Sequence, residues 1–247
     1  MADIYETDSI VREYLFFHYG KAEDVLPWPE GPHKALNFPV RCAEWLHKSA
    51  HATGSALDLG CAVGRSAFAL APHFDRVQGI DYSQAFVNAA NRLNAEGAID
   101  IRYPVEGELD LALRIEIPPA NNLQFIRGDA CELPHDIGSF DALLMANLIC
   151  RLYDPAKCLD RLPGLVNPGG VVLITTPCTW LELFTPREKW MGGVIRGGEP
   201  VCTLDGLKAA LEGPFTLEKT VDMPFLIREH ARKFQWSVAE ASIWRRV

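Results

Sequence analysis

The chain has 247 residues, of which 48% are hydrophobic and 23% charged, and its formal net charge at pH 7 is −8. Such a composition is typical of a globular protein with a full core, and the acidic balance argues against nucleic acid as a partner. No apolar run approaches the roughly 20 residues of a membrane helix, so we expect no membrane partner, and the start of the chain lacks a signal-peptide pattern.

The cysteine pattern argues against a disulfide-rich protein and against a cysteine-bound metal site. The chain has 7 cysteines, scattered and without a C-x-x-C pair, which predicts neither a disulfide framework nor a metal site. A reducing cytoplasm is therefore the expected location.

The N-terminal 50 residues are predicted to form a helical cap. Asp8–Tyr19 carries apolar residues at helical spacing and stops before Gly20. Lys21–Phe38 is proline-rich and is predicted to be a loop, and a second helix is expected from Pro39 to about Lys48.

The aromatic run Phe16–Gly20 at the end of the first helix contains His18 and Tyr19. Two interpretations stay open for it. The run could pack the helix onto the rest of the domain, or it could be a lid whose rings and histidine face a small-molecule pocket.

The segment Ser55–Ser66 is predicted to be a buried strand, a glycine turn and the start of a helix. Gly60 and Gly64 stand in the turn, where glycine lets the backbone approach a ligand closely. The N-terminus of the following helix adds free N–H groups.

The next strand, Arg76–Asp81, ends on an acidic residue about 20 positions after the glycine turn. A carboxylate at this place can accept hydrogen bonds from both hydroxyls of a ribose. Ser83 can cap a helix over Gln84–Ala95. Together these elements predict a βαβ unit that binds a nucleoside.

The segment Ile99–Pro119 alternates in polarity on either side of a short turn, which predicts an inserted β-hairpin. The hairpin could shape a substrate pocket or pair across a dimer.

Strands and helices then alternate. Strands are expected at Leu123–Asp129, Phe140–Asn147 and Val171–Thr176, with a helix from about Pro155 to Leu165. This order predicts a mostly parallel sheet. Ligands of such sheets bind at the carboxyl ends of the strands, and four residues fall at these ends: Gly60, Asp81, Asp129 and Asn147.

The C-terminal part is predicted to add a helix at Thr203–Leu211 and strands at Phe215–Val221 and Trp236–Trp244. The charged segment Asp222–Phe234 between these strands is predicted to be a loop.

Four short segments resemble the motifs of class I S-adenosylmethionine-dependent methyltransferases. They are Leu57-Asp-Leu-Gly-Cys-Ala-Val-Gly, Gly79-Ile-Asp-Tyr-Ser, Gly128-Asp-Ala-Cys-Glu-Leu-Pro and Asn167-Pro-Gly-Gly. One departure is Ala62, which stands where the family has a glycine. The resemblance implies a Rossmann-like α/β fold: a mostly parallel sheet with an antiparallel last strand and helices on both faces.

With this resemblance, residues 1–247 are expected to form a single methyltransferase domain. Residues 1–50 would be the cap, residues 51–97 and 120–247 the Rossmann-like core, and residues 98–119 the inserted hairpin.

A narrower resemblance covers almost the whole chain and is to the methyltransferases of ovothiol biosynthesis, which methylate a ring nitrogen of 4-mercaptohistidine (5-thiohistidine). The segments that carry it are Ile4-Tyr-Glu-Thr-Asp, Phe17-His-Tyr-Gly, Asn37-Phe-Pro-Val-Arg-Cys, Leu57–Ser66, Asn147-Leu-Ile, Thr179-Trp-Leu, Phe184-Thr-Pro and Arg228-Glu-His-Ala-Arg-Lys-Phe-Gln-Trp-Ser. Family members are separate proteins or the C-terminal domain of a sulfoxide synthase. The resemblance therefore implies a stand-alone form or an excised domain, with pairing to a separate synthase.

The resemblance implies roles for individual residues in binding S-adenosylmethionine. Arg41 would pair with its carboxylate, Asp81 would hold its ribose, Asp129 and Ala130 would contact its adenine, and Asn147 would lie near its methyl group. The complete expected set is Arg41, Asp58, Gly60, Cys61, Ala62, Gly64, Asp81, Tyr82, Asp129, Ala130 and Asn147.

An amino-acid substrate needs a cation for its carboxylate and an acceptor for its ammonium, which Arg228 with Glu229, helped by Arg232, could supply. The same three residues could instead form an ion-pair cluster on the surface. His18 and Tyr19 would bond the imidazole or the sulfur, with Tyr5 and Thr179 as weaker candidates. Methyl transfer needs alignment more than acid–base chemistry. No dedicated base is therefore assigned, and the candidates for a catalytic role are His18 and Asn147.

Two other functions stay open. The chain could be a different small-molecule N-, O- or S-methyltransferase, or a non-catalytic subunit that binds the cofactor.

Overall fold

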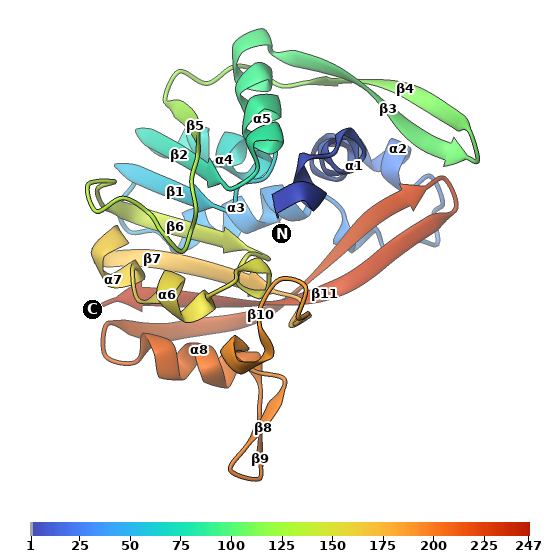
Figure 1. Cartoon of the computed structure of the whole chain (residues 1–247). Helices are drawn as coiled ribbons and strands as arrows, with labels where there is room; N and C mark the ends of the chain where they lie inside the picture. Colours follow the sequence, from blue (N-terminus) through green and yellow to red (C-terminus); the bar gives the residue numbers. More distant parts are fainter. Residues whose placement is uncertain (1) are drawn as a thin grey trace.

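The computed structural model describes residues 2–247 and contains a central sheet with the strand order β10-β11-β7-β6-β1-β2-β5 (Figure 1). Neighbouring strands from β5 to β7 pair in parallel, and β11 is antiparallel to both of its neighbours. The predicted parallel sheet with an antiparallel last strand is confirmed. The strands are β1 (Ser55–Leu59), β2 (Arg76–Asp81), β5 (Leu123–Arg127), β6 (Phe140–Ala146), β7 (Val166–Thr176), β10 (Phe215–His230) and β11 (Lys233–Arg246).

Both faces of the sheet are covered by helices, which explains why inner strands such as β1 and β6 are buried almost throughout. In β6, Ala142 and Leu144 belong to one buried cluster, while Leu143 and Met145 belong to the other. The first cluster includes residues of α1 (Asp8–Tyr19), α3 (Phe38–Ser49), α4 (Arg65–Leu70) and α5 (Gln84–Glu96). The second includes residues of α6 (Pro155–Leu159), α7 (Leu162–Leu165) and α8 (Thr203–Leu211).

Two long hairpins leave the body of the molecule and approach each other (Figure 1). One is the expected insertion, formed by β3 (Ala98–Glu106) and β4 (Leu109–Glu116). The other, the outer hairpin, is the part of β10 and β11 that extends beyond β7, since β7 pairs only with Glu240–Arg245 of β11. The two hairpins meet where the N–H of Ala231 donates to the carbonyl of Val105 at 3.2 Å, and α1 contacts both.

The expected loop over Asp222–Phe234 is wrong. Nearly all of it is strand, with β10 running to His230 and β11 starting at Lys233. Pro224 is tolerated because β10 is an edge strand of the sheet, where a missing N–H donor breaks no ladder.

The N-terminal helix α1 has the predicted bounds, and its N-cap is Thr7, whose hydroxyl accepts from the N–H of Ile10. The predicted loop that follows contains α2 (Ala22–Val25). The helix expected over Pro155–Leu165 is split into α6 and α7.

A small hairpin of β8 (Val194–Arg196) and β9 (Glu199–Val201) was not predicted. Short 3-10 helices lie at Ala2–Glu6, His33–Ala35, Ala71–His73, Ile149–Arg151 and Arg187–Lys189. Within residues 2–247, no helix is long and apolar enough to cross a membrane.

Candidate functional site

A cavity of about 340 Å³ opens at the carboxyl edge of the parallel strands. Residues at the carboxyl ends of β1, β2, β5 and β6 form its polar part. Aromatic residues line other parts of the wall, and they come from the N-terminal segment, from the loop after β7 and from strand β10. Of the residues expected to bind the cofactor, the cavity is lined by Asp58, Gly60, Cys61, Ala62, Asp81, Tyr82, Asp129, Ala130 and Asn147.

In the turn after β1, two glycines and one alanine have a left-handed backbone. Gly60, Ala62 and Gly64 have φ angles of 78°, 47° and 89°, so Ala62 occupies a left-handed conformation that an L-residue adopts at a cost. A Cβ on Gly60 would lie 2.7 Å from Leu148, and one on Gly64 would lie 2.5 Å from the Phe125 ring. Gly64 does not line the cavity. Glycine is needed there because the backbone is left-handed and a Cβ would collide with the Phe125 ring.

Asp81 ties the end of β2 to both neighbouring turns. Its Oδ2 accepts from the N–H of Ala62 at 2.8 Å, and its Oδ1 accepts from the N–H of Ser83 at 2.9 Å. Burial raises the pKa of Asp81 to about 6, although these N–H groups oppose the rise. The carboxylate is thus held in place at the wall of the cavity.

Asp58 is a buried carboxyl with one unpaired oxygen beneath the glycine turn. Its side chain is 1% exposed, and its Oδ2 finds no hydrogen-bond partner within the described chain. Burial, with the nearby charge of Asp81 as a smaller cause, raises the pKa of Asp58 to about 7. A buried acceptor that lines a cavity without a partner favours a cationic or donating ligand.

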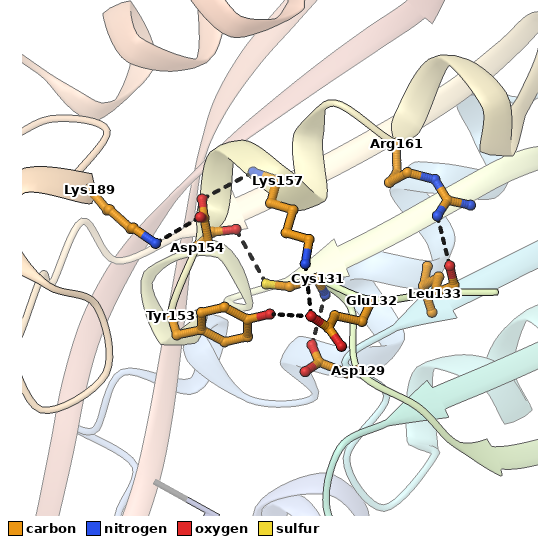
Figure 2. Close-up of polar contacts among 9 residues, drawn as sticks. All are labelled: Asp129, Cys131, Glu132, Leu133, Tyr153, Asp154, Lys157, Arg161 and Lys189. Atoms are coloured by element: carbon orange, nitrogen blue, oxygen red, sulfur yellow. Dashed lines mark hydrogen bonds and ion pairs between the residues drawn. The ribbon is translucent and has the colours of Figure 1, made fainter. Parts of the chain in front are cut away.

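The loop that carries Asp129 and Ala130 is anchored by a polar network (Figure 2). The Asp129 carboxylate accepts from the N–H of Cys131 at 2.8 Å, and the Cys131 thiol donates to the carbonyl of Asp154 at 3.2 Å. Lys157 binds Glu132 at 2.8 Å from the neighbouring helix α6. The loop is therefore fixed to the segment that follows β6.

Tyr82 lies at the rim of the cavity, where 49% of it is exposed. Its ring packs against the Arg127 guanidinium at 5.5 Å.

Asn147 follows β6 in a left-handed conformation with φ of 54°. Its N–H donates to the Thr175 hydroxyl at 3.0 Å, and that hydroxyl donates to the Asn147 Oδ1 at 2.9 Å. Neighbouring β7 therefore fixes the Asn147 side chain where it lines the cavity.

Helix α1 serves both of the roles that the sequence left open. Leu15 and Phe16 are buried in the core, whereas Tyr14, Phe17 and His18 line the cavity. Burial, helped by the charge of Arg65, lowers the pKa of His18 to about 3, so its imidazole is neutral at physiological pH. Its Nδ1 is buried and has no partner among residues 2–247.

Two residues expected in the site bind the backbone elsewhere. Arg41 donates from Nε to the carbonyl of Leu36 at 3.0 Å and from Nη2 to the carbonyl of Pro224, which ties α3 to β10. The Tyr19 hydroxyl donates to the carbonyl of Val63 at 2.8 Å and so holds α1 on the glycine turn. Neither lines the cavity.

The charged cluster expected to bind the substrate does not line the cavity either. The rings of Phe16 and Tyr103 stack on each other at 4.0 Å, and the Arg228 guanidinium lies beside this pair, 5.6 and 5.2 Å from the two ring centres. It also donates to the carbonyl of Asp24. Through its hydrogen bonds it joins β10 to α2, and through the two rings it contacts α1 and the β3–β4 hairpin.

Three further residues stand outside the cavity. Glu229 pairs with Lys233 at 2.6 Å on the outer hairpin, and Arg232 is exposed in its turn. Thr179 donates from its hydroxyl to the carbonyl of Pro177 at 3.3 Å.

Several lining residues had no assigned role from the sequence. Among them are the aromatic residues Tyr14, Phe38, Phe184 and Phe225, and the cation Arg151. Arg151 stands four residues after Asn147, and a cation just past a strand's carboxyl end was the signal that could have identified it. In the described chain, no group of three or more His, Cys, Asp or Glu side chains could hold a metal ion.

Sequence comparison relates the middle of the chain to known proteins. Residues 57–174 match the family described as methyltransferase domain. The chain is 26% identical over 151 residues to the ubiquinone biosynthesis O-methyltransferase of Xylella fastidiosa and 28% identical over 148 residues to that of Xanthomonas campestris. The matches cover 60% of this chain but only 52% and 53% of those proteins, so the chain spans about half the length of the curated relatives it matches.

Solved structures share the fold over nearly the whole chain. The magnesium protoporphyrin IX methyltransferase of Synechocystis aligns over 100% of this chain and 98% of its own, with a TM-score of 0.60 and 16% identity. The N-methyltransferase NodS of Bradyrhizobium japonicum aligns over 96% and 98%, with a TM-score of 0.55 and 14% identity.

Proposed function

We propose that residues 57–174 form a class I S-adenosylmethionine-dependent methyltransferase domain. On this premise, we propose that the protein methylates the imidazole ring nitrogen of 4-mercaptohistidine. This transfer is the last step of ovothiol A biosynthesis. When bound, S-adenosylmethionine supplies an electrophilic methyl group that a nucleophile takes by direct displacement.

The residues at the strand ends fit this cofactor. The Asp58 Oδ2, buried and without a partner in the described chain, suits an ammonium group, and the close backbone at Gly60 and Ala62 leaves room beside it. Asp81 can accept from ribose hydroxyls, and Asp129 with Ala130 can bond an adenine edge. Asn147 would lie on the acceptor side.

One observation carries the choice of acceptor. The segments that resemble ovothiol methyltransferases lie far apart in sequence, yet most of them contribute to the same cavity. Ile4-Tyr-Glu-Thr-Asp provides Tyr5, Phe17-His-Tyr-Gly provides Phe17 and His18, and Phe184-Thr-Pro provides Phe184. The same holds for Phe38 with Pro39 and for Asn147 with Leu148. Because most of these segments line the cavity, the resemblance supports the same acceptor as in the ovothiol methyltransferases.

The wall suits a small aromatic ring. The Tyr14 ring lies 5.8 Å from His18, and the Phe38 ring lies 5.1 Å from Phe225. Such rings exclude water and hold a planar acceptor by its faces and edges. His18, neutral and buried, can exchange a hydrogen bond with an imidazole but is too weak a base to take up its proton. Catalysis then rests on alignment, and the electron-rich mercaptoimidazole needs no strong base.

A second candidate is methylation of an aromatic hydroxyl. The matched relatives are named ubiquinone biosynthesis O-methyltransferases, and an aromatic cavity also accepts a phenol. A third function, cofactor binding without turnover, predicts binding and no product.

The test is a substrate panel. The purified protein, incubated with S-adenosylmethionine, should form S-adenosylhomocysteine with 4-mercaptohistidine and not with histidine or a catechol. Turnover of the catechol alone would favour the hydroxyl acceptor, and binding without any product would favour the non-catalytic role. A separate sulfoxide synthase is the partner that would supply the mercaptohistidine precursor.

A further inference from the structure

Arg151 is the one permanent cation on the wall of the cavity as the described residues form it. The other charged lining residues are the carboxyls of Asp58, Asp81 and Asp129. The arginines first expected to bind carboxylates, Arg41 and Arg228, are used to hold the backbone.

Arg151 is fixed in place by one of its nitrogens. Nη1 donates to the carbonyl of Thr179 and to the carbonyl of Cys150, both at 3.1 Å, and the guanidinium lies 4.7 Å from the centre of the Phe184 ring. These backbone contacts all use Nη1, so the N–H groups of Nε and Nη2 stay available to Tyr5 and a ligand. Among the side chains that the structure describes, which start at Ile4, no carboxylate forms an ion pair with Arg151.

The neighbours of Arg151 belong to the cover of the cavity. The Tyr5 ring stacks on Phe184 at 6.2 Å and meets the Tyr14 ring edge-on at 6.1 Å. Burial raises the pKa of Tyr5, and the Arg151 guanidinium opposes this rise, so the two groups lie close enough to interact. Tyr14 in turn contacts His18, at 5.8 Å between rings. A continuous wall thus runs from Arg151 through two tyrosines to the neutral imidazole of His18.

A guanidinium that keeps unused N–H groups beside buried aromatic rings is a binding group for an anion. Its fork geometry matches a carboxylate, and a bidentate pair of this kind adds both affinity and orientation. Two carboxylates could reach the cavity, that of the cofactor and that of an amino-acid acceptor. Arg151 is bound to the loop after β7 and lies beside Tyr5, whereas the glycine turn that approaches the cofactor follows β1. Arg151 is thus held on the part of the wall that the loop after β7 forms, and this placement favours the acceptor.

We propose that Arg151 binds the carboxylate of the acceptor and makes the enzyme specific for α-amino acids over the corresponding amines. The inference rests on the proposed function, since it assigns a group to the same acceptor. Arg151 would fix one end of the substrate, and the ring at the other end would lie between Tyr14 and His18.

The test compares two acceptors, 4-mercaptohistidine and its decarboxylated analogue 4-mercaptohistamine, in the wild type and in Arg151→Gln. With 4-mercaptohistidine, we expect the KM for the acceptor to rise 10- to 100-fold in the variant. With 4-mercaptohistamine, the variant and the wild type should differ by less than about 3-fold, because the amine has no carboxylate to lose. Arg151→Lys should recover part of the loss, since a single ammonium replaces the fork.

Arg246→Gln is the matched control. The Arg246 guanidinium also donates to backbone carbonyls and lies over a phenylalanine, Phe215, but far from the cavity lining. This control should leave both KM values unchanged, and the thermal midpoint of each variant reports whether it folds.

The outcomes are distinct. An equal loss with both acceptors would overturn the role in carboxylate binding. A matching rise in the dissociation constant of S-adenosylmethionine, measured by calorimetry, would assign Arg151 to the cofactor instead. If the wild type methylates neither acceptor, the proposed function fails, and this inference fails with it.

Discussion

The Asp81 carboxylate accepts a hydrogen bond from the backbone N–H of Ala62 at 2.8 Å, which ties the end of β2 to the glycine turn after β1. The same side chain accepts from Ser83 at the start of α5. Each carboxylate oxygen can accept one more bond, so Asp81 can support the turn and hold a ribose together.

Asp81→Asn should therefore weaken S-adenosylmethionine binding by about 1–3 kcal/mol, because one acceptor becomes a donor and the charge is lost. Asp141→Asn is a suitable control, since Asp141 also accepts from a backbone N–H, that of Ser55, but does not line the cavity. Calorimetry checks both variants. Unchanged affinity in Asp81→Asn would remove the ribose assignment.

Asp58 should make the stability of the ligand-free protein depend on pH. Its pKa is about 7 in the folded chain, against 3.8 for an unperturbed carboxyl. The folded state therefore holds a proton that the unfolded state releases, and stability falls as pH rises from about 4 through 7. Asp58→Asn should stabilise the protein, by about 1 kcal/mol more at pH 8.5 than at pH 6.

The same variant should bind S-adenosylmethionine more weakly, because the carboxylate that would meet the cofactor ammonium is gone. Thermal unfolding at both pH values and calorimetry measure the two effects. A gain in stability that is the same at both pH values would contradict the raised pKa of Asp58.

Ala62 tests the tightness of the turn. Its φ of 47° costs an L-residue about 1–2 kcal/mol, and glycine would remove this strain while adding freedom to the unfolded chain. We expect Ala62→Gly to keep both stability and cofactor affinity close to wild type. Ala62→Val should lose at least 10-fold in affinity, since a β-branched side chain disfavours this backbone and fills the cavity. Calorimetry showing tight binding by the valine variant would refute the close approach.

Arg228 is expected to be structural. Arg228→Met should lower the free energy of unfolding by about 1–3 kcal/mol, because charge-assisted bonds to the backbone and contacts with two aromatic rings are lost. The KM for the acceptor and the dissociation constant of the cofactor should stay within about 3-fold of wild type. A selective rise in the acceptor KM, without a loss of stability in denaturant unfolding, would instead return Arg228 to the substrate site.

The sheet could be predicted because its signals are local. Apolar runs such as Phe140–Ala146 and the glycine turn after Leu59 are readable from a few residues, and the parallel order follows from the alternation of elements. The outer hairpin could not be predicted in the same way. Its residues Asp222–Phe234 are charged and contain Pro224, and they become strand only through pairing with each other and contact with α1 and β3.

The same distinction holds for the site. Residues at strand ends, such as Asp81 and Asn147, could be assigned to the site from the sequence, because the topology alone brings the strand ends to one edge of the sheet. Arg228 and Arg151 differ in tertiary context: Arg228 is buried beside the stacked rings of Phe16 and Tyr103, and Arg151 lines the cavity. The positions of the two arginines in the sequence do not show which of them lines the cavity.

The most direct test of the account is the identity of the product formed from 4-mercaptohistidine. With S-adenosylmethionine labelled in its methyl group, mass spectrometry should find one labelled methyl on the product, and nuclear magnetic resonance should place it on a ring nitrogen. Asp81→Asn should form the same product more slowly at limiting cofactor. A methyl group on sulfur or on the α-amine, or no transfer while a hydroxyl acceptor is methylated, would contradict the proposed function.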